Sequence, residues 1–144
     1  MEALSNRGTI LMALDRPEEA LASYERALIL APNHAEALYN LGTSLQELNR
    51  LPEALATYDR ALAARPDYAE ALNNRATTLL ALKRVDEALA SWNRALEVRP
   101  DYPEALYNRG DGLIELNRPQ EALASYDRAL VLTPDDAAAL NNRS

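Results

Sequence analysis

Apolar residues recur along this chain at the spacing of amphipathic helices, and the helical blocks come in pairs. In the stretch 35–68, the first block holds Leu38, Leu41, Leu45 and Leu48, and the second holds Leu55, Tyr58, Ala61 and Leu62. This spacing predicts two helices, over about 36–48 and 52–65. Asn49 falls where the chain must turn between them, and asparagine tolerates the left-handed backbone that ends many helices. Lys83, at the same place in the next pair, suits that backbone less well.

The paired pattern has a period of 34 residues. Proline marks it at Pro32, Pro66, Pro100 and Pro134. The segments 1–34, 35–68, 69–102 and 103–136 align without a gap, and fifteen of the 34 positions are identical in all four. Residues 137–144 begin a fifth segment that is cut short, which suggests a fragment of a longer array. Because one helix pair cannot bury its apolar faces alone, the pairs are expected to stack.

Each segment also carries one small residue in its first helix, and two alanines around one aromatic residue in its second. These sets are Gly8, Ala20, Tyr24 and Ala27; Gly42, Ala54, Tyr58 and Ala61; Ala76, Ala88, Trp92 and Ala95; and Gly110, Ala122, Tyr126 and Ala129. Small residues beside one bulky side chain predict that the two helices of a pair approach each other closely.

At these residues the chain resembles the tetratricopeptide repeat (TPR) family. The period and the order Leu, Leu-Gly, Leu, Ala, Tyr, Ala, Pro match the family pattern over residues 1–136. Two places depart from it. The family's first aromatic is leucine here, and the leucine that follows is arginine at Arg7, Arg75 and Arg109. The resemblance implies an all-α fold, a right-handed α-solenoid whose first helices line a concave groove that receives an extended peptide or a partner helix.

Composition excludes several classes of function. The net charge of −7 argues against a nucleic-acid surface, which needs a basic patch. No signal peptide and no apolar run near the ~20 residues of a membrane span is present, so we expect a non-membrane protein, cytoplasmic by default. With no cysteine, His34 as the single histidine and no GxxxxGK loop, the sequence predicts no catalytic residue, metal site or cofactor, and no enzyme. Asp135-Asp136 reads as a helix start rather than a metal site.

One polar position is harder to explain by folding alone. Asparagine recurs there as Asn6, Asn40, Asn74, Asn108 and Asn142, an array that we call the asparagine ladder. Asn40 lies about 200° around its helix from Leu38, away from the core of its own segment. Asparagine costs roughly 0.5 kcal/mol relative to alanine in a helix, so a compensating role is expected. Each amide either bridges to the first helix of the neighbouring segment or hydrogen-bonds the backbone of a bound peptide, and both roles are compatible.

The resemblance sharpens the second alternative. A similar asparagine ladder is found in the TPR superhelix of O-linked N-acetylglucosamine transferases, where it contacts the backbone of the protein substrate. The resemblance therefore implies a peptide-binding face, without the transferase chemistry. Besides the ladder, the candidate peptide-binding residues are Tyr39, Thr43, Asn73, Thr77, Tyr107 and Asp111.

The same face is predicted to be acidic, with no cation opposite its carboxylates. Its acids are Glu2, Glu36, Glu47, Glu70, Glu104, Asp111 and Glu115. An acidic groove would repel the anionic C-terminal tails held by chaperone-binding TPR domains, so the expected partner is a neutral or basic peptide or protein.

Three functions follow from these observations. The first is a protein-protein interaction scaffold that uses the concave groove. The second is a substrate-recruiting arm of a larger enzyme such as a glycosyltransferase. The third is a self-associating array, because an uncapped terminal segment exposes an apolar face that only residues 137–144 could partly cover, and this would allow end-to-end association.

Overall fold

A computed structural model describes residues 1–133, which form eight α-helices. They are α1 (Glu2–Ala13), α2 (Pro17–Leu30), α3 (Ala35–Glu47), α4 (Leu51–Ala64), α5 (Ala69–Ala81), α6 (Val85–Val98), α7 (Pro103–Glu115) and α8 (Pro119–Leu132). Each segment of 34 residues contributes one helix pair, so the predicted all-α solenoid is confirmed. The predictions for Asn142, Asp135-Asp136 and the fifth segment lie outside the described residues.

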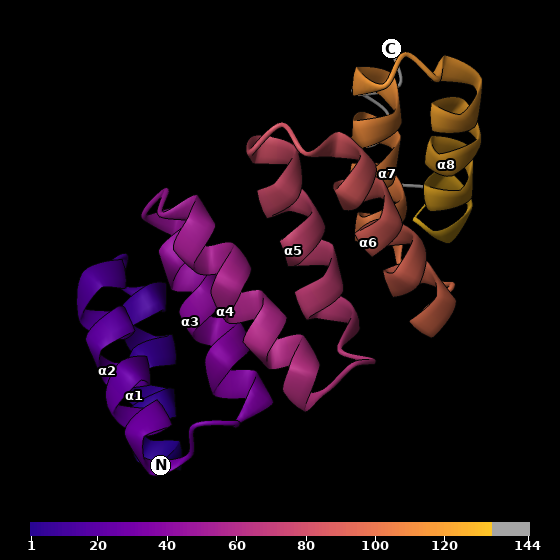
Figure 1. The fold of residues 1–144 in the computed structure, drawn as a ribbon. Coiled ribbons are helices and arrows are strands. Elements are labelled where there is room, and N and C mark those ends of the chain that lie inside the picture. The colour runs from indigo at the N-terminus through magenta and orange to yellow at the C-terminus, as the bar shows by residue number, and fades with distance from the viewer. Residues whose placement is uncertain (134–144) are drawn as a thin grey trace.

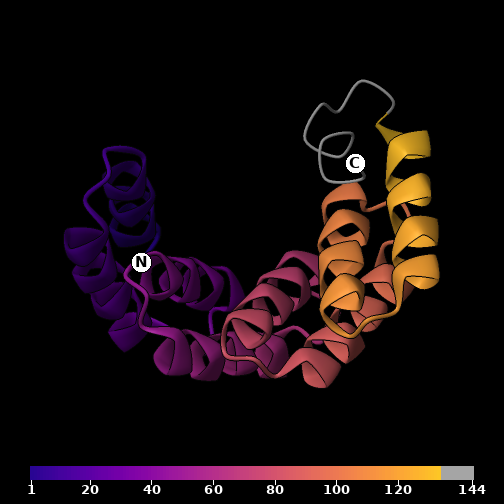
Figure 2. The same ribbon diagram turned by 90° about the horizontal axis from the view of Figure 1, so that it is seen from above.

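The helix pairs stack in chain order (Figure 1). Each second helix packs on the first helix of its own pair and on the first helix of the next, as α2 does on α1 and α3. First helices also contact one another, α1 with α3, α3 with α5 and α5 with α7, whereas second helices make no comparable contact within residues 1–133. Figure 2 shows the resulting arc, with α7 on its inner side and α8 on its outer side. The first helices thus line the concave face, and the second helices stand apart on the convex face.

The turn inside each pair uses a left-handed residue, as predicted at Asn49. The four such residues have φ between 56° and 64°, and they are Asp15, Asn49, Lys83 and Asn117. After α3, the N–H of Asn49 donates to the carbonyl of Gln46 and that of Arg50 donates to the carbonyl of Leu45, both at 2.9 Å. This pair of bonds satisfies two carbonyls at the helix end, which explains why the chain accepts the strained φ.

In each pair, a small residue of the first helix stands opposite an aromatic ring of the second helix, so the two helices can pack closely. A Cβ atom added at Gly8, Gly42 or Gly110 would lie 2.5–2.6 Å from Cε1 of the tyrosine in the same pair. The third pair differs, because Ala76 and Trp92 replace the glycine and the tyrosine. The larger indole reaches into the fourth pair, where a Cβ added at Gly112 would lie 2.6 Å from Cζ3 of Trp92. The aromatic residue of one pair therefore sets the size of a residue in the next.

Candidate functional site

The concave face contains a hollow of about 490 Å³ that spans three first helices. Its lining comes from α3, α5 and α7, and consists of Thr43, Gln46, Glu47, Asn74, Thr77 and Glu104. Three of these residues, Thr43, Asn74 and Thr77, belong to the candidate set from the sequence. The stacking of first helices thus gathers polar side chains from three successive segments onto one surface.

Gln46 orders the polar groups of this hollow, although it is not among the residues predicted to bind a peptide. Its Nε2 donates to Oγ1 of Thr77 in the neighbouring third segment at 3.0 Å. Its Oε1 accepts from the hydroxyl of Tyr58, in its own segment, at 2.7 Å. That hydroxyl also lies 3.3 Å from Oγ1 of Thr43. A signal was available, because the other three segments carry apolar residues at this place, namely Met12, Leu80 and Ile114.

The described members of the asparagine ladder divide into two groups. Asn74 donates from Nδ2 to the hydroxyl of Tyr39 at 3.1 Å, and Asn108 donates from Nδ2 to Oδ1 of Asn73 at 3.3 Å. Both bonds join first helices of neighbouring segments, as the bridging alternative requires. Asn6 is exposed and Asn40 half-buried, and neither side chain hydrogen-bonds another residue within 1–133. The bridging role is therefore present at Asn74 and Asn108 and not at Asn6 or Asn40.

Asn73, predicted as a peptide-binding residue, does not lie on the surface of the groove. Its side chain is buried, with 1% exposed. Oδ1 accepts from Nε1 of Trp92 at 3.0 Å and from Asn108, while Nδ2 is buried with no hydrogen-bond partner among residues 1–133. Asn73 is therefore part of the packing between the third and fourth segments rather than of a ligand surface.

The two candidate tyrosines, Tyr39 and Tyr107, pack against other tyrosine rings. The ring of Tyr39 lies 5.1 Å from that of Tyr68 and 6.2 Å from that of Tyr58, and burial raises the pKa of Tyr39 above its ordinary value. The ring of Tyr107 lies 5.7 Å from that of Tyr126. Both Tyr39 and Tyr107 remain half-buried. They can still present an edge to a ligand from a fixed orientation.

The candidate Asp111 lies in α7, one segment beyond Thr77. It accepts a hydrogen bond from the hydroxyl of Tyr126. Burial raises the pKa of its carboxyl group, and the nearby charge of Glu115 acts in the same direction. Asp111 is half-buried and does not line the hollow.

The acidic character of the face holds with one exception. Glu47 and Glu104 line the hollow, and none of its lining residues is a lysine or arginine. Glu70, however, forms an ion pair with Arg99 at 2.9 Å, so the prediction that no cation faces these acids is wrong at this residue. Arg99 also lies over the ring of Tyr102, 4.6 Å from its centroid, which keeps the cation at the end of the helices.

The described residues give no sign of a membrane span or a metal cluster. Within residues 1–133, no helix combines the length and the apolar character needed to cross a bilayer. The same residues contain no group of three or more histidine, aspartate or glutamate side chains that could hold a metal ion.

Stacked helix pairs with a small-on-aromatic core and a polar concave face define this protein as an α-solenoid of repeats. The chain belongs to the tetratricopeptide repeat family, because sequence models of that family match residues 1–67 and 73–137. Tetratricopeptide repeats generally act as protein-protein interaction scaffolds and are typically non-catalytic. No curated protein sequence shows a significant similarity to the chain.

Solved structures share the fold. A crystal structure of MamA is 23% identical over 95% of this chain and 80% of that chain, with a TM-score of 0.87. Pseudomonas aeruginosa PilF is 24% identical over 96% and 63% of the two chains, with a TM-score of 0.89. YrrB, described as a TPR protein with an unusual peptide-binding site, is 25% identical over 97% and 90%, with a TM-score of 0.70.

Proposed function

We propose that this protein is an interaction scaffold that holds an extended, neutral or basic segment of a partner protein in its concave groove. The observation that carries the proposal is the hollow across α3, α5 and α7, which combines amide and hydroxyl groups with two carboxylates and no cation. YrrB supports it, since a similar TPR chain is described as having a peptide-binding site.

The amide groups suit the backbone of a peptide. A primary amide carries two N–H donors and a carbonyl acceptor, so it can pair with both backbone groups of a peptide regardless of sequence. Asn40 has none of these groups committed to another described residue, and Asn74 donates one N–H to Tyr39. A bridging asparagine therefore keeps further hydrogen-bonding capacity for a ligand. Thr43 and Thr77, one segment apart, extend the same polar strip.

The two carboxylates give the groove its preference for charge. Glu47 and Glu104 lie on α3 and α7, so they flank the amide of Asn74 on α5. A lysine or arginine of the peptide would meet a carboxylate on either side, and an acidic peptide would be repelled. Because these groups are at the surface, the attraction should weaken as ionic strength rises.

The test is a peptide array with neutral, basic and acidic members, followed by titration of the hits by fluorescence anisotropy. Glu47→Gln and Glu104→Gln remove charge at constant shape, and Asn40→Ala removes an amide that makes no internal bond. We expect each to weaken basic hits by about tenfold or less, corresponding to ~1.4 kcal/mol. The matched control is Asp86→Asn, an exposed acid at the start of the convex helix α6. Loss of affinity that is equal in the control, or no hits at all, would refute the proposal.

A specific observation also favours self-association as a second function. On the first segment of the chain described here, Ile10 and Leu14 are 60% and 59% exposed. The residues at the place of Ile10 in the next two segments, Ser44 and Thr78, are polar and buried against a preceding pair. A second copy could cover this face end to end. Sedimentation velocity at rising concentration tests this, because Ile10→Thr should shift the population toward monomer.

A further inference from the structure

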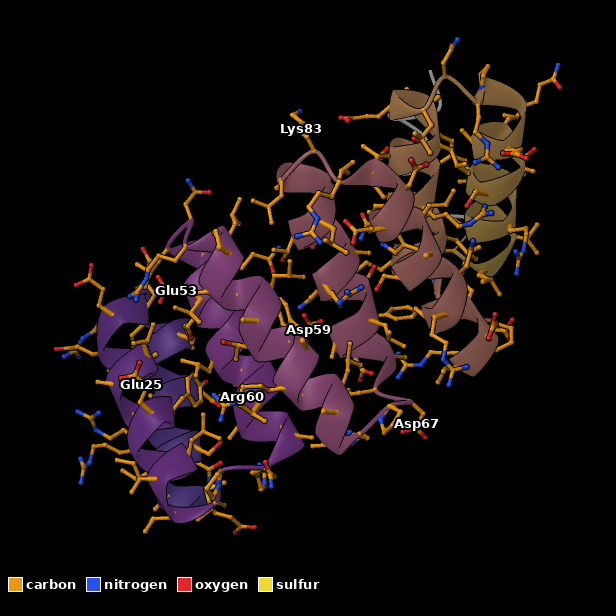
Figure 3. All side chains as sticks on the ribbon, in the orientation of Figure 1. Glu25, Glu53, Asp59, Arg60, Asp67 and Lys83 are labelled. Carbon is orange, nitrogen blue, oxygen red and sulfur yellow. The ribbon has the colours of Figure 1, made fainter. Side chains whose placement is uncertain are left out.

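The convex face holds a separate groove of about 450 Å³ between α2 and α4. Its lining is Glu25, Leu28, Ile29, Leu41, Leu45, Glu53, Ala56, Thr57 and Arg60. Figure 3 shows Glu25 on α2, with Glu53 and Arg60 on α4 across from it. The nearly buried Leu28, Leu41 and Leu45 form an apolar floor, contributed by α2 and the underlying α3.

At the two corresponding places farther along the convex face, an arginine of the chain contacts the preceding second helix. Between α4 and α6, the guanidinium of Arg75 reaches from α5 to the carboxylate of Asp59, with Nε 2.6 Å from Oδ1. Between α6 and α8, Nε of Arg109 on α7 donates to Oδ1 of Asn93 at 2.7 Å. In both cases an arginine from the floor helix binds an oxygen on the preceding second helix. The arginine stem also covers apolar surface.

The groove between α2 and α4 lacks this arginine. Leu41 occupies the place of Arg75 and Arg109, and Glu25 occupies the place of Asp59 and Asn93. Glu25 is exposed and makes no hydrogen bond or ion pair with another residue in 1–133. The nearby guanidinium of Arg50 is held by Glu53, with Nη2 2.6 Å from Oε2. Arg60, the arginine in the lining, donates from Nη2 to the carbonyl of Pro32 at 3.3 Å, so no side chain within residues 1–133 donates to the carboxylate of Glu25.

A second substitution makes the same groove more apolar. Ile29, on its rim, is 78% exposed, whereas the second and third segments carry Ala63 and Glu97 at this place. An exposed isoleucine beside a leucine floor adds apolar surface that a docked segment could remove from water. The groove between α2 and α4 thus combines Ile29 with Leu41, whereas the next two places along the convex face combine Ala63 with Arg75 and Glu97 with Arg109.

We propose that the groove between α2 and α4 is a docking site for an amphipathic segment of a partner protein that presents an arginine next to an aliphatic side chain. The arginine takes the place that Arg75 and Arg109 occupy farther along the convex face and binds the carboxylate of Glu25. The aliphatic side chain packs on Ile29 and on the floor at Leu41. This site lies on the opposite face from the concave groove and does not depend on the function proposed there.

The variant Leu41→Arg provides a direct test, because it installs the residue that the chain already uses at Arg75 and Arg109. The probe is a synthetic amphipathic helical peptide with arginine and leucine about four residues apart, on one face. We expect wild-type protein to bind it, and Leu41→Arg to weaken binding by about tenfold or more by filling the groove from within. Unchanged affinity in a folded Leu41→Arg protein would overturn the proposal, as would absence of binding to wild type.

Two milder variants keep the test decisive if Leu41→Arg does not fold. Glu25→Gln and Ile29→Glu alter exposed side chains, so neither is expected to disturb the core. Each should weaken the same peptide by about fivefold to tenfold, and a peptide with glutamine in place of arginine should lose its sensitivity to Glu25→Gln. Asp86→Asn, an exposed acid on α6 that lines neither groove, is the control and should have no effect. Binding that responds to Glu47→Gln and not to Glu25→Gln would place the peptide in the concave groove and refute this site.

Discussion

The indole Nε1 of Trp92 donates a hydrogen bond to Oδ1 of Asn73 at 3.0 Å, and both side chains are almost completely buried. The bond joins the two helices of the third segment. The same Oδ1 accepts from Asn108 of the fourth segment, so one amide oxygen links three helices. The first and second segments carry Tyr24 and Tyr58 at the place of Trp92. The hydroxyls of these tyrosines lie within hydrogen-bonding distance of Oγ1 of Thr9 and Thr43.

Removal of this acceptor should destabilise the protein. Asn73→Ala leaves a buried indole N–H unsatisfied, which costs about 1–3 kcal/mol of unfolding free energy. In a Trp92→Phe background the donor is absent, so the same change should cost less. Urea denaturation of the four proteins of this double-mutant cycle measures the coupling. Equal losses in both backgrounds would show that the hydrogen bond contributes nothing specific.

Gly112 should tolerate a side chain only when Trp92 is reduced. Gly112→Ser introduces the residue found at Ser44, but its Cβ would lie 2.6 Å from the indole. Overpacking of this kind costs about 1–3 kcal/mol. Combination with Trp92→Tyr and Ala76→Gly restores the arrangement of Gly8, Tyr24 and Ser44, and thermal denaturation should show that Gly112→Ser costs less in this background. An equal cost of Gly112→Ser in both backgrounds would contradict the packing argument.

Lys83→Asn should stabilise the protein. Lys83 adopts φ 64°, a left-handed backbone that costs a residue other than glycine or asparagine about 1 kcal/mol. Asn49 and Asn117 occupy the same place with φ of 59° and 57°. Because Lys83 is exposed, the change affects little else, and we expect a gain of about 0.5–1 kcal/mol in urea denaturation. A variant no more stable than wild type would show that the lysine is not strained.

Tyr39→Phe separates the two roles of the asparagine ladder. The change removes the hydroxyl that accepts from Asn74 and keeps the ring that packs on Tyr58 and Tyr68. We expect a loss of about 0.5–1.5 kcal/mol in stability, since one inter-segment hydrogen bond is lost. Asn40→Ala, at the same place in the second segment, should cost less because its side chain makes no internal bond. Equal costs would argue against bridging by Asn74.

Alkaline pH should unfold the protein through its tyrosines. Burial raises the pKa of Tyr58, Tyr68 and Tyr102 to about 12, against about 10 in the unfolded chain. The folded state holds these protons more tightly, so their contribution is fully present below pH 10 and is lost as pH rises from about 10 to 12. Circular dichroism and tyrosinate absorbance should change together in this range. Tyr58→Phe should shift the midpoint upward, whereas early tyrosinate formation in folded protein would contradict the assignment.

The predicted helices near α3 and α4, the left-handed residue at Asn49 and the pairing of Gly42 with Tyr58 could all be read from the sequence. Each depends on interactions within one segment. The burial of Asn73 could not be read, because helical spacing gives the direction of a side chain and not what covers it. Trp92 and Asn108 cover it here.

The sequence by itself determined the period, the helix pairs and their stacking, since amphipathic faces repeated every 34 residues can be buried only against their neighbours. The tertiary structure alone decided which polar residues bond to one another and which stay open on the surface. Asn74 meets Tyr39 from 35 residues away, and Arg75 meets Asp59 from 16 residues away. Such contacts depend on the exact stacking of successive pairs, a property of the assembled solenoid that no single helix encodes. They leave open the concave hollow and the convex groove between α2 and α4, whereas Arg75 and Arg109 contact the preceding second helix farther along the chain.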